Sequence, residues 1–184
     1  MKKLLIALAL TLSAGLLFAA GINLADRSSS SNTESTNSSK PKGSGAKLSF
    51  TTIDLNGKSV DASSIFSKNK ITMINVWATY CGPCISEMPD LAKLNAEYKS
   101  KGVEIIGVVS DINANSRNKA SSIVSKTGAN YTHLVPCNAM KFLYDIDAVP
   151  TTIFVDSEGR QIGKAYVGSR SKSDWKRIID SLLK

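Results

Sequence analysis

The sequence is poor in residues that bind metals, since its 184 residues include only three cysteines and one histidine. A structural zinc site needs four ligands, usually supplied by two pairs of Cys or His. Cys81 and Cys84 form one pair, and His133 with Cys137 is the other pair that the chain offers. A Cys3His zinc site is therefore possible in number. The Gly-Pro dipeptide between Cys81 and Cys84 favours dithiol exchange instead.

The sequence also lacks a basic stripe with interleaved aromatic residues, although its formal net charge is +8. The lysines and arginines are scattered, with a mild cluster at Lys172, Lys176 and Arg177. This distribution argues against nucleic acid as a partner. It is typical of a solvated surface with some attraction to an anionic membrane or wall. No internal repeat is visible.

The first 25 residues predict a signal anchor or a signal peptide. Met1-Lys2-Lys3 is basic, and Leu4 to Ala25 is almost wholly apolar and close to the ~20 residues that a membrane span requires. No small-x-small cleavage site is clear, which favours an uncleaved anchor over a cleaved signal. No cysteine follows this segment, which excludes a lipoprotein anchor. In either case the remainder is expected outside the cytoplasm, where disulfide chemistry is permitted.

Residues 26–46 predict a disordered tether, because this stretch is rich in Ser and Gly and has few apolar side chains to bury.

Residues 47–184 have a normal size for one globular domain. Near-continuous apolar runs at 71–77 and 103–109 are typical of buried parallel strands. Further elements are expected as follows: an N-terminal hairpin over 48–61 turning at Asn56-Gly57, helices at 84–100, 116–127 and 139–144, strands at 131–135, 151–155 and 161–167, and a last helix at 173–183 with Ser173 as its N-cap. This order predicts an α/β domain in which helices flank a central mixed sheet.

The apolar strand 71–77 leads directly into Cys81-Gly82-Pro83-Cys84 and a helix. A helix N-terminus carries partial positive charge and free N–H groups, which favour a thiolate at Cys81. Pro83 suits the first helical turn, which tolerates a residue without an N–H. Cys84, about one turn further on, is expected to be less exposed and to resolve a mixed disulfide formed at Cys81. An inert structural disulfide is the alternative, but so short a loop removes little entropy from the unfolded chain.

Three motifs in this order carry a family resemblance: Trp77-Ala-Thr-Tyr80-Cys-Gly-Pro-Cys84, Glu87-Met-Pro89 and Val149-Pro150-Thr-Thr152. Together they resemble thioredoxin-fold proteins, and most of all the TlpA/ResA-like branch of extracytoplasmic thiol-disulfide oxidoreductases. The resemblance covers nearly all of 47–184. It implies a thioredoxin-like fold with an N-terminal β-hairpin extension, and no cofactor besides the dithiol.

The resemblance also implies roles for single residues. Cys81 matches the attacking cysteine, Cys84 the resolving one, and Pro150 a cis-proline that lies against the dithiol. The backbone of Val149 would bind the substrate, Trp77 would pack behind the dithiol, and Glu87 matches a carboxylate kept just after the site. Because Glu87 lies three residues after Cys84 on one helix face, we expect it to exchange a proton with Cys84; the alternative is an ordinary first-turn acid that only favours the helix dipole.

There are three departures from the family pattern. Asn75 stands where ordinary thioredoxins have a buried aspartate, and Tyr80 replaces the more usual tryptophan before the first cysteine. Cys137 matches no family role; it is either a third redox thiol or an idle cysteine.

These observations predict a membrane-tethered thiol-disulfide oxidoreductase that acts on disulfide-containing proteins. Because Gly82-Pro83 resembles the insert of reducing thioredoxins, we expect a reductase, which would need a membrane electron donor of the CcdA/DsbD type.

There are two alternatives: a disulfide-forming oxidase, and a non-catalytic domain that delivers copper or another metal. Met73, Met88 and Met140 are interpreted as core residues and not as a copper site. A peroxiredoxin is disfavoured, because Ile74 and Ala78 occupy the Pro and Thr positions of its motif.

Overall fold

The structure, a computed structural model, describes residues 45–113 and 116–184. The predicted anchor (1–25) and the predicted tether up to residue 44 lie outside these residues. No helix within the described part of the chain combines the length and apolar character needed to cross a bilayer.

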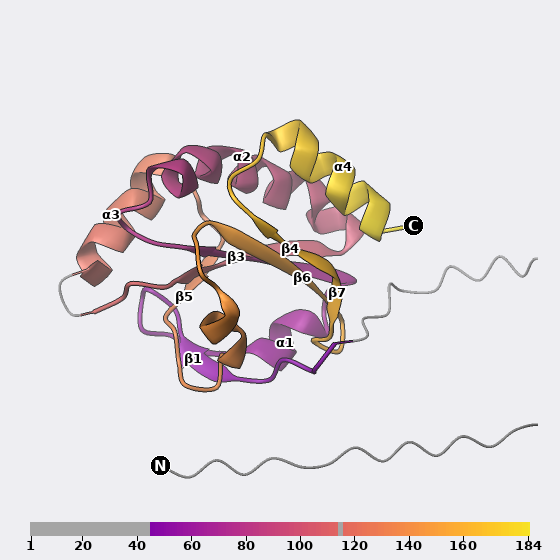
Figure 1. Cartoon of the computed structure of the whole chain (residues 1–184), viewed down its shortest axis with the longest axis horizontal. Coiled ribbons are helices and arrows are strands. Elements are labelled where there is room, and N and C mark those ends of the chain that lie inside the picture. The colour runs from indigo at the N-terminus through magenta and orange to yellow at the C-terminus, as the bar shows by residue number, and fades with distance from the viewer. Residues whose placement is uncertain (1–44, 114–115) are drawn as a thin grey trace, which may run out of the picture. The chain divides into compact units, whose positions relative to one another are not determined.

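The centre of the domain is a five-stranded sheet with the strand order β5-β4-β3-β6-β7 (Figure 1). Its strands are β3 (Ile71–Trp77), β4 (Val103–Val109), β5 (Thr132–Leu134), β6 (Thr151–Asp156) and β7 (Gln161–Val167). β3, β4 and β5 run parallel, while β6 is antiparallel to both β3 and β7. Every residue of β3 is buried, as expected for a central strand covered on both faces. The predicted mixed sheet is confirmed.

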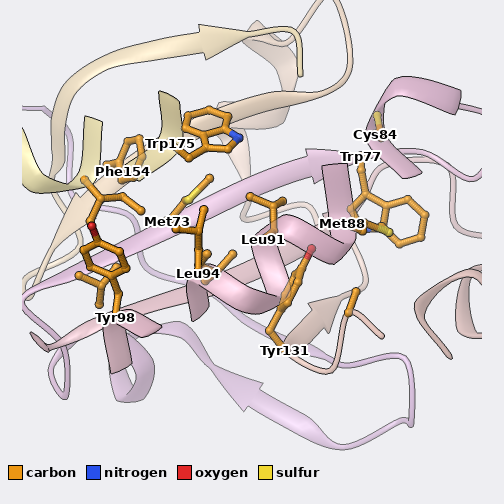
Figure 2. Packing of buried hydrophobic residues seen from close by; sticks show 14 of the residues in the cluster. Met73, Trp77, Cys84, Met88, Leu91, Leu94, Tyr98, Tyr131, Phe154 and Trp175 are labelled. Atoms are coloured by element: carbon orange, nitrogen blue, oxygen red, sulfur yellow. The ribbon is translucent and has the colours of Figure 1, made fainter. Parts of the chain in front are cut away.

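Helices α2 (Gly82–Tyr98), α3 (Ser116–Thr127) and α4 (Lys172–Leu182) cover one face of this sheet (Figure 1). Between that face and the helices lies a core that includes Met73, Leu91 and Trp175 (Figure 2). The other face is covered by α1 (Ala62–Phe66) and the 3-10 helix η2 (Lys141–Asp145), over a second apolar cluster. A second 3-10 helix, η1 (Lys99–Lys101), extends α2. The sheet therefore sits between two apolar layers, which hold its strand ends in place.

The predicted N-terminal hairpin is present as β1 (Thr51–Ile53) paired antiparallel with β2 (Ser59–Asp61). Gly57 lies in its turn with φ of 83°, a conformation that glycine adopts without steric cost. The backbone N–H of Leu55 donates to His133 O at 3.0 Å, and that of Val135 donates to Ile53 O at 2.9 Å. These bonds attach the hairpin to the free edge of β5.

Two local predictions were wrong. The N-cap of α4 is Ser171 and not Ser173, because the Ser171 hydroxyl accepts a hydrogen bond of 3.2 Å from the backbone N–H of Asp174. The helix predicted at 139–144 is the 3-10 helix η2, in which the backbone N–H of Leu143 donates to Met140 O three residues earlier. In both cases the pattern of apolar residues located the element, but side-chain and turn geometry decided its ends.

Candidate active site

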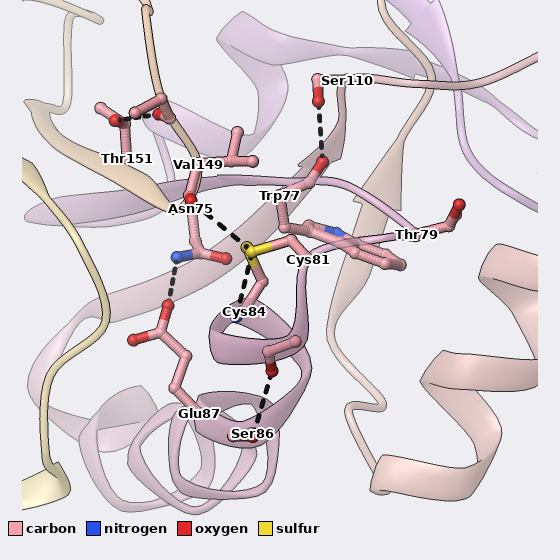
Figure 3. Close-up of a disulfide and its surroundings, with 12 residues drawn as sticks. Asn75, Trp77, Thr79, Cys81, Cys84, Ser86, Glu87, Ser110, Val149 and Thr151 are labelled. Atoms are coloured by element: carbon pink, nitrogen blue, oxygen red, sulfur yellow. Dashed lines mark hydrogen bonds between the residues drawn. A yellow bond between two sulfur atoms is a disulfide. The ribbon is translucent and has the colours of Figure 1, made fainter.

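Cys81 and Cys84 are joined by a disulfide at the start of α2, with 5.3 Å between their Cα atoms (Figure 3). Cys81 is the N-cap of α2, and its sulfur accepts a hydrogen bond of 3.2 Å from the backbone N–H of Cys84. Pro83 occupies the first turn, where no intrahelical partner for an N–H exists. The sequence thus places the Cys81 sulfur at the positive end of a helix with an N–H group directed at it, an environment that stabilises a thiolate.

The two sulfur-bearing residues differ in access to solvent. Cys81 is 6% exposed, whereas Cys84 is completely buried. A partner approaching from solvent therefore meets Cys81 first, as predicted from the spacing. Cys84 is bonded to the Cys81 sulfur and has no surface of its own exposed to solvent.

The loop between β3 and Cys81 is held by hydrogen bonds to the end of β4. The backbone N–H of Thr79 donates to Asp111 at 3.0 Å, and the Thr79 hydroxyl donates to the same carboxylate at 2.6 Å. The backbone N–H of Ser110 donates to Trp77 O at 2.8 Å. These bonds fix the backbone that carries Cys81 before α2 begins.

The predicted cis-proline lies against the dithiol. The Val149–Pro150 peptide bond is cis, and Pro150 is buried. The Val149 carbonyl oxygen is 3.6 Å from the Cys81 sulfur (Figure 3). The backbone N–H of Gly168 donates to Pro150 O at 2.8 Å, and the Thr151 hydroxyl donates to Ala148 O at 2.7 Å. Val149 and Pro150, 65 or more residues after the cysteines, are thus brought to the same place.

Glu87 is buried one turn beyond Cys84, with 4% of its surface exposed. Its carboxylate accepts hydrogen bonds from Asn75 Nδ2 at 3.0 Å, from the backbone N–H of Arg170 at 3.1 Å and from Trp175 Nε1 at 3.2 Å. Burial raises the pKa of Glu87, and the three donors with the Arg170 charge offset part of that rise. It is therefore not a solvent-exposed acid that merely favours the helix dipole. It is a desolvated carboxylate beside the dithiol.

Asn75, the first departure from the family pattern, is fully buried between Glu87 and the disulfide (Figure 3). Its amide nitrogen also donates to the Thr152 hydroxyl at 3.0 Å. Its amide oxygen has no hydrogen-bond partner among the residues that the structure describes. Asn75 therefore serves the carboxylate as a donor and adds no second acid to the site.

Trp77 packs behind the dithiol, as the resemblance implied, but its partner was not predicted. Its indole N–H donates to His133 Nδ1 at 3.1 Å, and His133 Nε2 lies 3.0 Å from Ala129 O. The two rings meet edge to face with centroids 5.6 Å apart. They meet above Gly107, where an added Cβ would lie 2.3 Å from His133 Nδ1. Glycine inside an apolar strand is a signal of close approach, and that signal was available in the sequence.

The imidazole of His133 is neutral around pH 7. Burial lowers its pKa to about 4, and its hydrogen bond to the Ala129 carbonyl only partly offsets that effect. A ring with Nδ1 as acceptor and Nε2 as donor satisfies both contacts in the neutral form. Since both nitrogens have protein partners, His133 is not arranged to complete a zinc site with Cys137.

Two further predicted residues, Tyr80 and Cys137, line one groove beside Cys81. Tyr80, immediately before Cys81, is 73% exposed. Cys137 is a free, partly buried cysteine beyond the end of β5 and lines the same groove as Tyr80. Within the described residues no three His, Cys, Asp or Glu side chains converge as metal ligands. Met73, Met88 and Met140 are buried in the apolar core.

The chain resembles known proteins along most of its length. The Redoxin family model matches residues 37–180. The thiol-disulfide oxidoreductase ResA of Halalkalibacterium halodurans is 34% identical over 130 residues, which cover 68% of each chain. The ResA of Bacillus subtilis is 30% identical over 125 residues, which cover 67% of this chain and 66% of that protein. A crystal structure of a thiol:disulfide interchange protein of the thioredoxin family from Chlorobium tepidum TLS superposes with a TM-score of 0.64 and 26% identity, covering 79% of this chain and 99% of that one.

Proposed function

The chain belongs to the Redoxin family as a thiol-disulfide oxidoreductase of the ResA type, and from this premise we propose that it is a membrane-tethered reductase of disulfides in extracytoplasmic proteins. The observation that supports the exchange mechanism is the unequal burial of the two cysteines at the start of α2: Cys81 keeps 6% of its surface exposed, whereas Cys84 has none. This asymmetry assigns attack to one sulfur and resolution to the other.

The exchange proceeds in two balanced steps. The Cys81 thiolate attacks one sulfur of a substrate cystine; the substrate S–S bond breaks, a Cys81–substrate disulfide forms, and the other substrate sulfur leaves as a thiolate that takes a proton. The Cys84 thiol then loses its proton and attacks the Cys81 sulfur. The second substrate sulfur leaves and is protonated, and Cys81–Cys84 is left as the disulfide. Two electrons pass from the protein to its substrate.

Three residues support these steps. The backbone N–H of Cys84 stabilises the Cys81 thiolate, and the Val149 carbonyl beside Cys81 is placed to bind substrate backbone. We infer that Glu87, buried one helical turn beyond Cys84 with a raised pKa, exchanges a proton with Cys84 during resolution. The direction is inferred from Gly82-Pro83. Continued reduction outside the cytoplasm then requires a membrane donor of dithiol electrons, of the CcdA/DsbD type.

The test of the exchange is trapping with Cys84→Ser, made in a Cys137→Ala background so that only Cys81 can form mixed disulfides. Cys84→Ser cannot resolve the first intermediate, so substrate proteins should stay attached to Cys81. The matched control is Cys81→Ser in the same background, which should trap none of these partners. The exchange mechanism would be wrong if both variants recovered the same proteins and the wild type failed to reduce insulin.

The direction of electron flow is tested separately by alkylating free thiols in intact cells. A reductase should be found mainly as the dithiol, and it should accumulate as the disulfide when its membrane donor is removed. A protein found mainly as the disulfide with the donor present would indicate an oxidase.

A further inference from the structure

The loop 168–171, which joins β7 to α4, contacts two parts of the active site. The backbone N–H of Gly168 donates to Pro150 O at 2.8 Å. Two residues further on, the backbone N–H of Arg170 donates to the Glu87 carboxylate at 3.1 Å. This short loop therefore ties the cis-proline to the buried acid.

The Arg170 side chain fixes the shape of this loop. Its guanidinium donates from Nη1 to Val167 O at 3.2 Å and to Gly168 O at 2.7 Å. The same guanidinium lies 5.1 Å from the ring centroid of Tyr166 and 5.1 Å from that of Trp175. A planar guanidinium is suited to this position, because it donates hydrogen bonds in its plane and also stacks on aromatic faces. Arg170 therefore fastens the loop to the last strand and to the last helix.

Two of the three donors to Glu87 are tied to Arg170. One is its own backbone N–H, and the other is the indole N–H of Trp175, the ring that lies against the guanidinium. Both donate to the same carboxylate oxygen, Oε2, whereas Asn75 donates to Oε1. Displacing the guanidinium would therefore loosen one oxygen of the carboxylate and leave the other held from β3.

Arg170 also supplies a positive charge that acts on Glu87. The other titratable groups that face this carboxylate are the Tyr131 phenol, ahead of β5, and the sulfurs of Cys81 and Cys84 (Figure 3). None of these is a cation, and β3 and α4 contribute neutral donors. Burial raises the pKa of Glu87, and the charge of Arg170 lowers it in part. Loss of that charge should therefore raise the pKa of Glu87 further.

We propose that Arg170 is a positioning residue for proton exchange at the dithiol, because it holds the β7–α4 loop whose donors fix the Glu87 carboxylate one helical turn beyond Cys84. The inference rests on the proposed function, in which Glu87 accepts the proton that Cys84 loses during resolution. Arg170 acts through Glu87 and is not itself a catalytic residue. Since only an ionised carboxylate accepts a proton, an Arg170 variant should need a higher pH than the wild type to resolve mixed disulfides.

The test separates the two steps of exchange with the small aromatic disulfide dithiobis(nitrobenzoate), mixed in equal amount with reduced protein in a Cys137→Ala background. Attack by Cys81 releases one thionitrobenzoate, and resolution by Cys84 releases the second as the Cys81–Cys84 disulfide forms. In Arg170→Gln the pH midpoint of the resolution step should move up by about 0.5–1 unit. The shift is smaller than for an arginine in direct contact, because the charge of Arg170 is the weakest of the effects on this carboxylate.

Three matched variants accompany this measurement. Arg170→Lys keeps the charge but loses the planar stack, so its shift should have the same direction and be smaller. Arg177→Gln removes an arginine of α4 whose side chain is 77% exposed, and it should keep the wild-type profile. In a Glu87→Gln background, Arg170→Gln should change the resolution step no further, because Arg170 acts through that carboxylate.

An Arg170→Gln profile that coincides with wild type, or an equal shift in the Glu87→Gln background, would overturn the positioning role while leaving disulfide exchange intact. If Arg170→Gln did not fold, Arg170→Lys would decide: a displaced profile would support the role, and a profile identical to wild type would contradict it. Failure of the wild type to reduce insulin would overturn the proposed function instead, so the two failures are distinguishable.

Discussion

The side-chain amide of Asn75 donates a hydrogen bond of 3.0 Å to Glu87, which joins the middle of β3 to the second turn of α2 beside the dithiol. The carboxylate therefore reaches the site from the helix, and the strand supplies a neutral donor. Ordinary thioredoxins, by contrast, carry an acid on the strand at this position. A second acid at position 75 would place two carboxylates together in a buried site, where like charges disfavour ionisation.

Glu87→Gln should lower the apparent pKa of the dithiol and slow resolution. Removing the carboxylate removes a negative charge that disfavours a nearby thiolate, and it removes the group that we propose exchanges a proton with Cys84. We expect resolution of a Cys81 mixed disulfide to slow by about tenfold or more. Thiolate absorbance and single-turnover rates measured against pH check this. Glu97→Gln, an exposed acid on the same helix, is the control; Glu87→Gln curves that coincide with it and with wild type would contradict the role.

Stability should depend on His133 at mildly acidic pH. The pKa of His133 is about 4 in the folded protein and about 6.5 when unfolded, so below pH ~6.5 the unfolded chain binds a proton that the native state does not. The free energy of unfolding should therefore fall as the pH drops from about 6.5 to about 4, by up to about 3 kcal/mol.

Denaturant unfolding across this pH range measures the effect. Because the chain has one histidine, His133→Asn should remove this part of the pH dependence while leaving that of the carboxylates. Parallel pH curves for the variant and the wild type would show that His133 is not buried in its neutral form.

Gly107→Ala should destabilise the domain. The Cβ of an alanine at position 107 would lie 2.3 Å from His133 Nδ1 and 3.1 Å from Trp77 Nε1. Both rings would therefore have to move away from β4. Overpacking of this kind costs roughly 1–3 kcal/mol or more of unfolding free energy. Thermal and denaturant unfolding test the prediction. Gly82→Ala, whose Cβ would meet nothing within 4 Å, is the matched control for stability.

Cys137→Ala should leave insulin reduction within about twofold of wild type, because exchange needs only the dithiol at the start of α2. A loss of about tenfold in a variant that still folds would show that the third thiol participates in exchange.

The N-terminal prediction is tested by cell fractionation. If Leu4 to Ala25 is an uncleaved anchor, the protein should sediment with membranes at its full mass and resist high-salt washing. A soluble form whose N-terminus lies beyond Ala20 would show that the segment is a cleaved signal. Cys137 and the dithiol are unaffected by either outcome, so insulin reduction serves as the control for folding.

The sequence alone determined the main architecture and the reactive pair. The near-continuous apolar runs at 71–77 and 103–109 are typical of strands covered on both faces of a parallel sheet. The spacing of Cys81 and Cys84 after such a strand likewise determines that a helix begins between them, because Pro83 suits a first turn. These inferences are local, since they depend on residues that are neighbours in the chain.

Only the tertiary structure decided which distant residues complete the site. Arg170 and Trp175 reach Glu87 from 83 and 88 residues away, and His133 meets Trp77 across 56. Hydrogen bonds across such separations depend on strand order and helix packing, and no local pattern records them. The groove beside Cys81 is of the same kind, because Tyr80 and Tyr144 line one cavity although they lie far apart in the sequence.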